Sequence, residues 1–96
     1  MFVLVTYDVN TMDAAGRRRL RQVAKQCVRH GQRVQSSVFE CLLEPAQYAT
    51  FQRTLCEIID PEKDSLRFYH LGSRYQTKLE HFGVENACDP EGVLLL

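Results

Sequence analysis

Two helix patterns, each enclosed by strand patterns, leave few folds open to this chain. The run FVLVTYDVN, from Phe2 to Asn10, is rich in β-branched and aromatic residues and predicts a central strand that is covered on both faces. A helix pattern follows, with apolar residues three and four positions apart, and it ends at His30-Gly31. The helix is predicted to pack on the sheet through an apolar stripe formed by Leu20, Val23, Ala24, Cys27 and Val28.

The middle of the chain continues with two strands, a second helix and a further strand. The segment RVQSSVFECLLE predicts strands from Arg33 to Ser36 and from Val38 to Leu43, joined by a tight turn. Pro45 starts a helix that ends before Asp60-Pro61, and LRFYHLG predicts a strand from Leu66 to Gly72. The order β-α-β-β-α-β predicts a ferredoxin-like α+β fold, with an antiparallel sheet and both helices on one face.

The C-terminal residues exceed what this fold requires. We predict one domain over residues 1–96, in which residues 1–74 form the basic unit and residues 75–96 form an added strand and a tail. A four-stranded sheet has open edges, which proteins tend to pair or cover. We therefore expect Thr77 to Phe82 to add to the sheet of the other protomer in a homodimer. The apolar end, Gly92 to Leu96, is expected to continue this exchange or to dock on an associated protein.

The placement of charge is more informative than its total. The chain has 12 basic and 12 acidic residues, so its net charge gives no pull toward nucleic acid or membrane. Between Ala14 and Phe39, however, there is no Asp or Glu, and the segment holds seven basic residues: Arg17, Arg18, Arg19, Arg21, Lys25, Arg29 and Arg33. This pattern predicts either a phosphate-binding face or a solvated helix face that acids elsewhere in the fold neutralise. No aromatic residue is interleaved with the arginines, which favours contact with a duplex backbone over stacking on single-stranded bases.

The cysteines and histidines indicate structural roles. The spacing of Cys27, Cys41, Cys56 and Cys88 includes no C-x-x-C pair and no zinc-finger pattern, which predicts reduced core thiols. The three histidines, His30, His70 and His81, are expected to be satisfied within the structure. The first apolar run is too short for a signal peptide, and no later segment approaches the length of a membrane span. We expect a cytoplasmic protein with no membrane partner.

Asp8 ends the first strand next to the loop that leads to the arginine-rich helix. A carboxylate beside a phosphate-binding face is unfavourable unless a cation lies between them. Mg²⁺ is commonly held by one or two carboxylates, waters and substrate phosphates, so two copies of Asp8 related by a dimer axis would suffice. The residues alone leave an alternative open, in which Asp8 caps a turn or the neighbouring helix.

Four segments, in order and at fitting spacing, resemble the small CRISPR-associated protein that is found beside the integrase in spacer acquisition, the family called Cas-two. They are TYDVN, RRRLRQVAK, GQRVQSSVFEC and KDSLRFYHLG, and the match runs over nearly the whole chain. The chain is most similar to the branch that ends with a Y-x-T-K-x-E-H stretch, formed here by Tyr75, Thr77, Lys78, Glu80 and His81.

The resemblance implies a ferredoxin-like homodimer in which the two Asp8 side chains bind Mg²⁺, or Mn²⁺, and act in catalysis. It also implies a metal-dependent endonuclease that acts on double-stranded DNA or RNA, and as the alternative a non-catalytic bridge between two integrase dimers. The nucleic-acid-binding residues that it implies, together with the basic helix, are Arg17, Arg18, Arg19, Arg21, Arg33 and Phe39. From the residues alone, Phe39 is also a plausible core residue.

Overall fold

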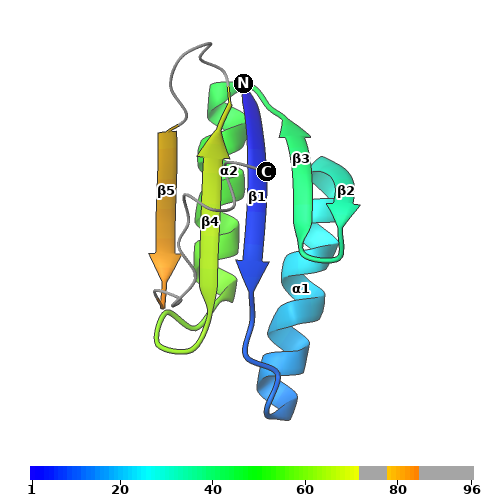
Figure 1. Cartoon of the computed structure of the whole chain (residues 1–96), viewed down its shortest axis with the longest axis vertical. Coiled ribbons are helices and arrows are strands. Elements are labelled where there is room, and N and C mark those ends of the chain that lie inside the picture. The colour runs from blue at the N-terminus through cyan, green and yellow to red at the C-terminus, as the bar shows by residue number, and fades with distance from the viewer. Residues whose placement is uncertain (72–77, 85–96) are drawn as a thin grey trace.

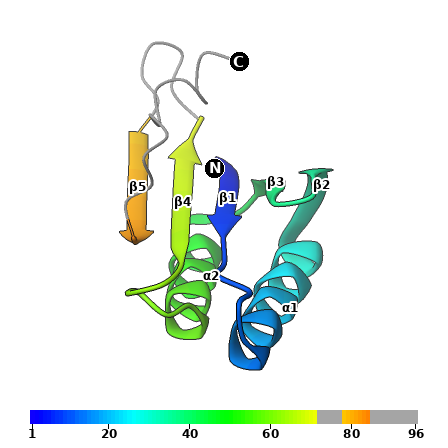
Figure 2. The ribbon, with the colours of Figure 1, turned by 60° about the horizontal axis from the view of Figure 1, so that its bottom comes forward.

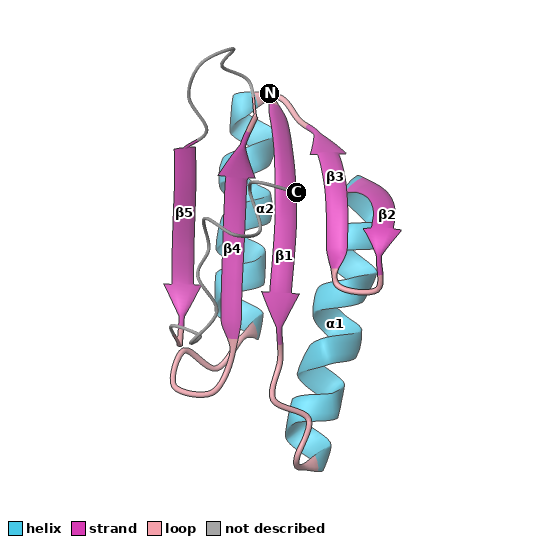
Figure 3. Cartoon of the chain, viewed as in Figure 1, coloured by secondary structure: helices cyan, strands magenta, loops and turns pink. Residues whose placement is uncertain are grey.

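A computed structural model of the protein describes residues 1–71 and 78–84. The elements in chain order are β1 (Phe2–Asp8), α1 (Ala14–His30), β2 (Gly31–Gln35), β3 (Val38–Leu42), α2 (Pro45–Ile58), β4 (Ser65–His70) and β5 (Lys78–Gly83). The strands form one antiparallel sheet in the order β2-β3-β1-β4-β5 (Figures 1 and 3). The predicted α+β ferredoxin-like fold, with strand breaks close to the expected positions, is confirmed.

β1 is the central strand of the sheet, as predicted, and its two faces are buried to different degrees. Val3, Val5 and Tyr7 are buried, whereas Leu4 and Thr6 are partly exposed. Figure 2 shows the reason, because α1 and α2 lie together on the same side of the sheet. The expectation that both faces of β1 are covered therefore holds in part. On the face opposite the helices Leu4 and Thr6 are half-buried, and their β4 neighbours Tyr69 and Arg67 are buried.

The two helices begin at the residues that the sequence favours and pack through their apolar stripes. Asp13 caps α1, and its side chain accepts a hydrogen bond from the Gly16 amide at 2.8 Å. Pro45 stands in the first turn of α2, and the helix ends before Asp60. The buried side chains of α2 are Tyr48, Phe51 and Leu55. Neither described helix combines the length and the apolar character that a membrane span requires.

The thiols in the described structure behave as core residues. Cys27 and Cys41 are buried and Cys56 is partly buried, and all three are free. Burial raises the pKa of Cys27 to about 12 and that of Cys41 to about 11, so neither forms a reactive thiolate near neutral pH. This confirms the prediction for three of the four cysteines, and Cys88 lies outside the described residues.

The fifth strand lies beside β4 of its own chain. β5 pairs antiparallel with β4, and Leu79 stands opposite Tyr69. The Tyr48 hydroxyl donates to the Glu80 carboxylate, and His70 Nε2 lies 2.7 Å from Glu80 Oε1, so β5 is also linked to α2. The exchange of this strand into a partner's sheet stays a prediction. The segment from Gly92 to Leu96 lies outside the described residues.

Candidate functional site

Asp8 is the last residue of β1 and is exposed. Tyr7 precedes it and points into the core, where burial raises the pKa of its phenol. Because side chains alternate along a strand, Asp8 lies on the face opposite the helices, with Ser65 of β4 as its cross-strand partner. The predicted position of Asp8, at the end of the central strand, is confirmed. The N-cap of α1 is Asp13, so Asp8 does not cap that helix.

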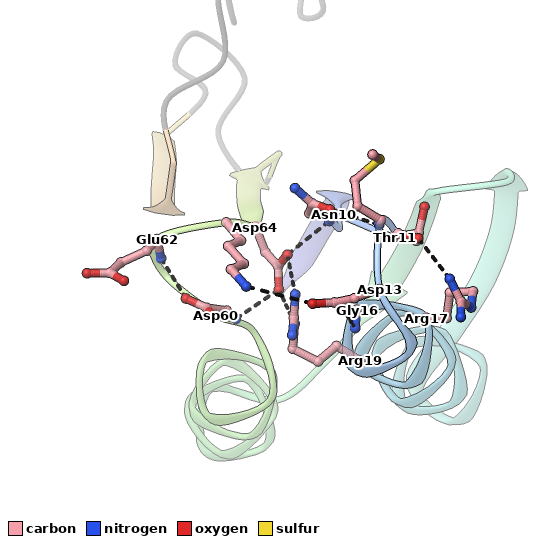
Figure 4. A network of polar contacts seen from close by, with 11 residues as sticks. Asn10, Thr11, Asp13, Gly16, Arg17, Arg19, Asp60, Glu62 and Asp64 are labelled. Carbon is pink, nitrogen blue, oxygen red and sulfur yellow. Dashed lines mark hydrogen bonds and ion pairs between the residues drawn. The ribbon is translucent and has the colours of Figure 1, made fainter.

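The loop between Asp8 and α1 is held by several contacts (Figure 4). The Asn10 amide donates to Asp64 Oδ1 at 3.0 Å, and Asn10 Oδ1 accepts from the Met12 amide at 2.9 Å. A Cβ atom on Gly16 would lie 1.9 Å from the Asn10 carbonyl oxygen, so only glycine lets the first turn of α1 approach this closely. The loop after Asp8 is therefore packed tightly against the start of α1.

Asp64 is the buried centre of these contacts, with no exposed surface. Its carboxylate accepts from Arg19 Nε at 2.7 Å, from the Asp60 amide at 2.8 Å and from the Asn10 amide. Burial alone would raise the pKa of Asp64, but these hydrogen bonds outweigh burial and hold the pKa below its usual value. The carboxylate is therefore ionised at neutral pH and joins α1, the loop after β1 and the loop before β4.

The predicted basic face divides into exposed arginines and one buried contact. Arg17, Arg18 and Arg21 are exposed on α1, and Arg17 Nη1 donates to the Thr11 carbonyl at 3.3 Å. The Arg19 side chain is 15% exposed and paired with Asp64. The interpretation that acids elsewhere in the fold neutralise the helix is confirmed for Arg19, and the phosphate-binding face stays a prediction. An acid from elsewhere in the fold neutralises Arg19, while the described residues include no ion-pair partner for the three exposed arginines.

Arg33 and Phe39 lie together but differ in exposure. Arg33 is exposed on β2, and its guanidinium carbon is 5.0 Å from the centroid of the Phe39 ring. Phe39 is fully buried, because its pairing with Val5 places it on the helix-covered side of the sheet. Its burial favours the core interpretation of Phe39, and its assignment as a nucleic-acid-binding residue stays a prediction. The structure supports the interpretation of Phe39 as a core residue. The Arg33 guanidinium packs over its ring.

The histidines are engaged inside the protein, as predicted. His30 Nδ1 lies 2.9 Å from the Gln26 carbonyl oxygen, and His81 Nε2 lies 3.0 Å from the Val84 carbonyl oxygen. His70 contacts Glu80.

Asp8 is our candidate metal ligand, because its carboxylate is exposed at the end of β1. No three His, Cys, Asp or Glu side chains converge into a metal site within residues 1–71 and 78–84. An exposed carboxylate oxygen suits Mg²⁺, which keeps several waters and needs few protein ligands. The donor set therefore fits Mg²⁺ if two protomers each contribute Asp8, and one chain alone supplies a single carboxylate.

Sequence reasoning missed Asp64 as part of this site. Asp64 stands directly before a strand of which every residue except His70 is buried. The signal that could have identified it is an acid at the entrance to a buried strand, in a chain with an otherwise unneutralised basic helix. Arg19 and Asp64 are separated by 45 positions in the sequence, so a local count of charge cannot detect the pairing.

Comparison with known proteins identifies the family and supports the fold. Residues 1–79 match the family model described as CRISPR associated protein Cas2. A "CRISPR-associated endoribonuclease Cas2" from Chlorobaculum tepidum is 56% identical over 96 residues, which covers all of both chains. A "CRISPR-associated endonuclease Cas2" from Halalkalibacterium halodurans is 50% identical over 95 residues, 99% of each chain. The crystal structure of Streptococcus pyogenes Cas2 at pH 6.5 superposes with a TM-score of 0.70 and 59% identity, covering 79% of this chain and 92% of that one.

Proposed function

The chain belongs to the Cas2 family of CRISPR-associated proteins, and we propose that it is an Mg²⁺-dependent endonuclease that acts on double-stranded DNA or RNA during spacer acquisition. One observation carries this proposal. An exposed carboxylate, Asp8, ends the central strand beside a helix that presents Arg17, Arg18 and Arg21 to solvent. Figure 1 shows the first turns of α1 extending beyond that end of β1. The names of the two relatives, an endoribonuclease and an endonuclease, support cleavage of a nucleic-acid backbone.

The proposed active form is a homodimer. On the sheet face opposite the helices, Phe2 and Leu42 are neighbours in register and are 41% and 76% exposed. A second protomer packed on this face would remove their apolar surface from water, at about 25 cal/mol for each Å² buried. Asp8 lies on the same face at the other end of β1, so a dimer axis that passes near that end of the strand would bring the two Asp8 side chains together. The integrase of the CRISPR system is the further partner that we propose.

The residues of the chain divide the work between binding and catalysis. The exposed arginines of α1 bind backbone phosphates without regard to sequence, and Arg33 adds a guanidinium held over the Phe39 ring. The two Asp8 carboxylates would hold Mg²⁺, which when bound offsets negative charge on the scissile phosphate. Because Asp8 stands at the rigid end of a strand, the carboxylate is placed without a large entropic cost.

The test of this proposal is the pair of variants Asp8→Asn and Asp13→Asn. Both remove one exposed carboxylate near the start of α1, and Asn still caps a helix at position 13. We expect Asp8→Asn to lower Mg²⁺-dependent cleavage of duplex DNA and of RNA at least about a hundredfold, the scale of an essential catalytic group. Asp13→Asn should cleave like the parent. Equal cleavage by the parent and by purified Asp8→Asn would show that the activity lies elsewhere or belongs to a contaminant.

A second role, the non-catalytic bridge between two integrase dimers, is supported by the basic face itself. Arg17, Arg18 and Arg21 can bind a duplex without any contribution from Asp8. The same Asp8→Asn variant separates the two roles in cells. Spacer acquisition that continues at the parent rate with Asp8→Asn supports the bridge, whereas loss of acquisition supports a need for catalysis.

A further inference from the structure

Arg19 differs from its neighbours on α1 in the partner of its guanidinium. Nε donates to Asp64 Oδ2 at 2.7 Å, and Nη2 lies 3.3 Å from Oδ1, so one edge of the guanidinium is committed to a buried carboxylate. The Arg19 side chain is 15% exposed, whereas Arg21, two positions along, is exposed. Arg19 is therefore paired and mostly buried, whereas Arg21 is exposed to solvent, although both belong to the same basic run.

Asp64 connects Arg19 to the end of β1, which carries Asp8, and to the start of β4, which pairs with it. The Asn10 amide, two residues after Asp8, donates to Asp64 Oδ1 at 3.0 Å. Asp64 also directly precedes Ser65, the cross-strand partner of Asp8. The contact with Arg19 is thus joined to the chain just after Asp8 and to the strand opposite it.

The first turn of α1 completes this arrangement. The space for a Cβ atom on Gly16 is filled by the Asn10 carbonyl oxygen, so α1 and the loop after Asp8 are in direct backbone contact. Figure 4 shows Arg19 reaching from α1 to Asp64 beside this loop. The loop is therefore held between its contact with the helix and its hydrogen bond to Asp64.

We propose that Arg19 is a positioning residue, which acts through Asp64 to hold the loop after Asp8 and does not itself bind the nucleic-acid backbone. This inference rests on the proposed function, because the position of Asp8 matters only if Asp8 acts on the bound nucleic acid. In this proposal Arg17, Arg18 and Arg21 bind the backbone phosphates. Arg19 instead stabilises the contact with the buried Asp64.

The first arm of the test measures duplex binding without Mg²⁺ at several salt concentrations, using a short blunt DNA duplex and the full chain. Arg21→Ala is the matched control, and we expect it to reduce the slope of log affinity against log salt by about 0.9 for each phosphate that the variant no longer neutralises. Arg19→Ala should leave that slope unchanged. Asp64→Asn should give no gain in affinity.

The opposite outcome of this arm is equally distinct. If Arg19 binds phosphate, Arg19→Ala reduces the slope as Arg21→Ala does, and Asp64→Asn strengthens duplex binding because it releases an arginine. Either result would overturn the inference. This arm needs no cleavage, so it gives an answer whether or not the parent is a nuclease.

The second arm measures Mg²⁺-dependent cleavage. Arg19→Ala and Asp64→Asn should each lower kcat about tenfold or more with KM nearly unchanged, and the double variant should be no worse, because both changes break the same link. Phe51→Leu, in the core of α2, is the control for general loss of stability and should retain the parent kcat when folded. Circular dichroism at the assay temperature confirms that each variant is folded.

The outcomes of the second arm separate this inference from the proposed function. If Asp8→Asn loses cleavage and Asp64→Asn cleaves like the parent, the positioning role is overturned and the nuclease stands. If the parent cleaves no faster than Asp8→Asn, the proposed function fails, and with it the positioning role of Arg19 in cleavage.

Discussion

Replacing Asp64 by Asn should destabilise the protein at neutral pH far more than the change of one atom suggests. The carboxylate is fully buried and accepts hydrogen bonds from Arg19 and from the Asn10 and Asp60 amides. An Asn side chain presents an NH₂ group to donors that need an acceptor, and it removes the charge that opposes Arg19. Breaking a buried ion pair costs about 3–5 kcal/mol, and we expect about 2–4 kcal/mol because Arg19 remains partly exposed to water.

This cost should depend on pH in a direction that the lowered pKa of Asp64 fixes. A carboxyl group with a folded pKa below its unfolded value stabilises the fold above the unfolded pKa, and loses that effect as the pH falls through the folded pKa. The unfolded pKa of Asp is about 3.9, so the parent should lose its advantage over Asp64→Asn below about pH 4. The difference in stability between the two proteins should therefore be full at pH 7 and shrink toward pH 2.

The assay is urea unfolding at pH 7, 5 and 3, at one protein concentration because a dimer gains stability with concentration. The urea midpoint and slope give the free-energy difference, and in a matching thermal scan about 2–4 kcal/mol corresponds to a fall in Tm of about 10–30 °C for a domain of this size. Asp60→Asn is the control in the same loop, since its side chain accepts from the Glu62 amide in an exposed turn and from no other described residue. An Asp64→Asn protein as stable as the parent at pH 7, or a difference that does not change with pH, would refute the reasoning.

Three further predictions concern binding and assembly. If a dimer neutralises about five phosphates through its exposed arginines, log duplex affinity against log salt should have a slope near about −4.5, and binding that ignores salt would contradict this. Glu80→Gln should cost about 1–3 kcal/mol and speed hydrogen exchange in β5, because Tyr48 and His70 lose a charged partner; unchanged exchange would show that β5 is held by its backbone pairing with β4. Deleting residues 77–96 should convert the dimer to a monomer in light scattering if the strand is exchanged, whereas a truncated chain that remains a tight dimer would place the interface elsewhere.

Local sequence patterns predicted the elements and the position of Asp8, because both depend on short spacings. The break at Ser36-Ser37, Pro45 at the start of α2 and the end of α1 near Gly31 are all signals within a few residues. The face of β1 that carries Leu4 and Thr6 was harder to predict. Its residues suit a covered strand, and in the structure Leu4 and Thr6 are partly exposed while their β4 neighbours Tyr69 and Arg67 are buried.

The contacts of individual side chains could be predicted less well, because they join distant parts of the chain. Arg19 and Arg21 look alike in the sequence, and only the fold brings Asp64 to one of them. The burial of Phe39 follows from its pairing with Val5, because this pairing places Phe39 on the helix-covered face of the sheet. For β5, alternation predicts a strand but not the copy of β4 that it pairs with, since the same residues face either copy.

The most direct test of the role of Asp8 is the distance between the two Asp8 carboxylates in crystals of the homodimer, grown with and without Mg²⁺. If the proposed site is correct, one oxygen from each Asp8 should lie about 2.1 Å from a shared ion, which places the two oxygens within about 4.2 Å of each other. Carboxylates that stay more than about 6 Å apart at saturating Mg²⁺, with no ion between them, would contradict a shared magnesium site. That result would leave the non-catalytic bridge as the remaining proposal for this chain.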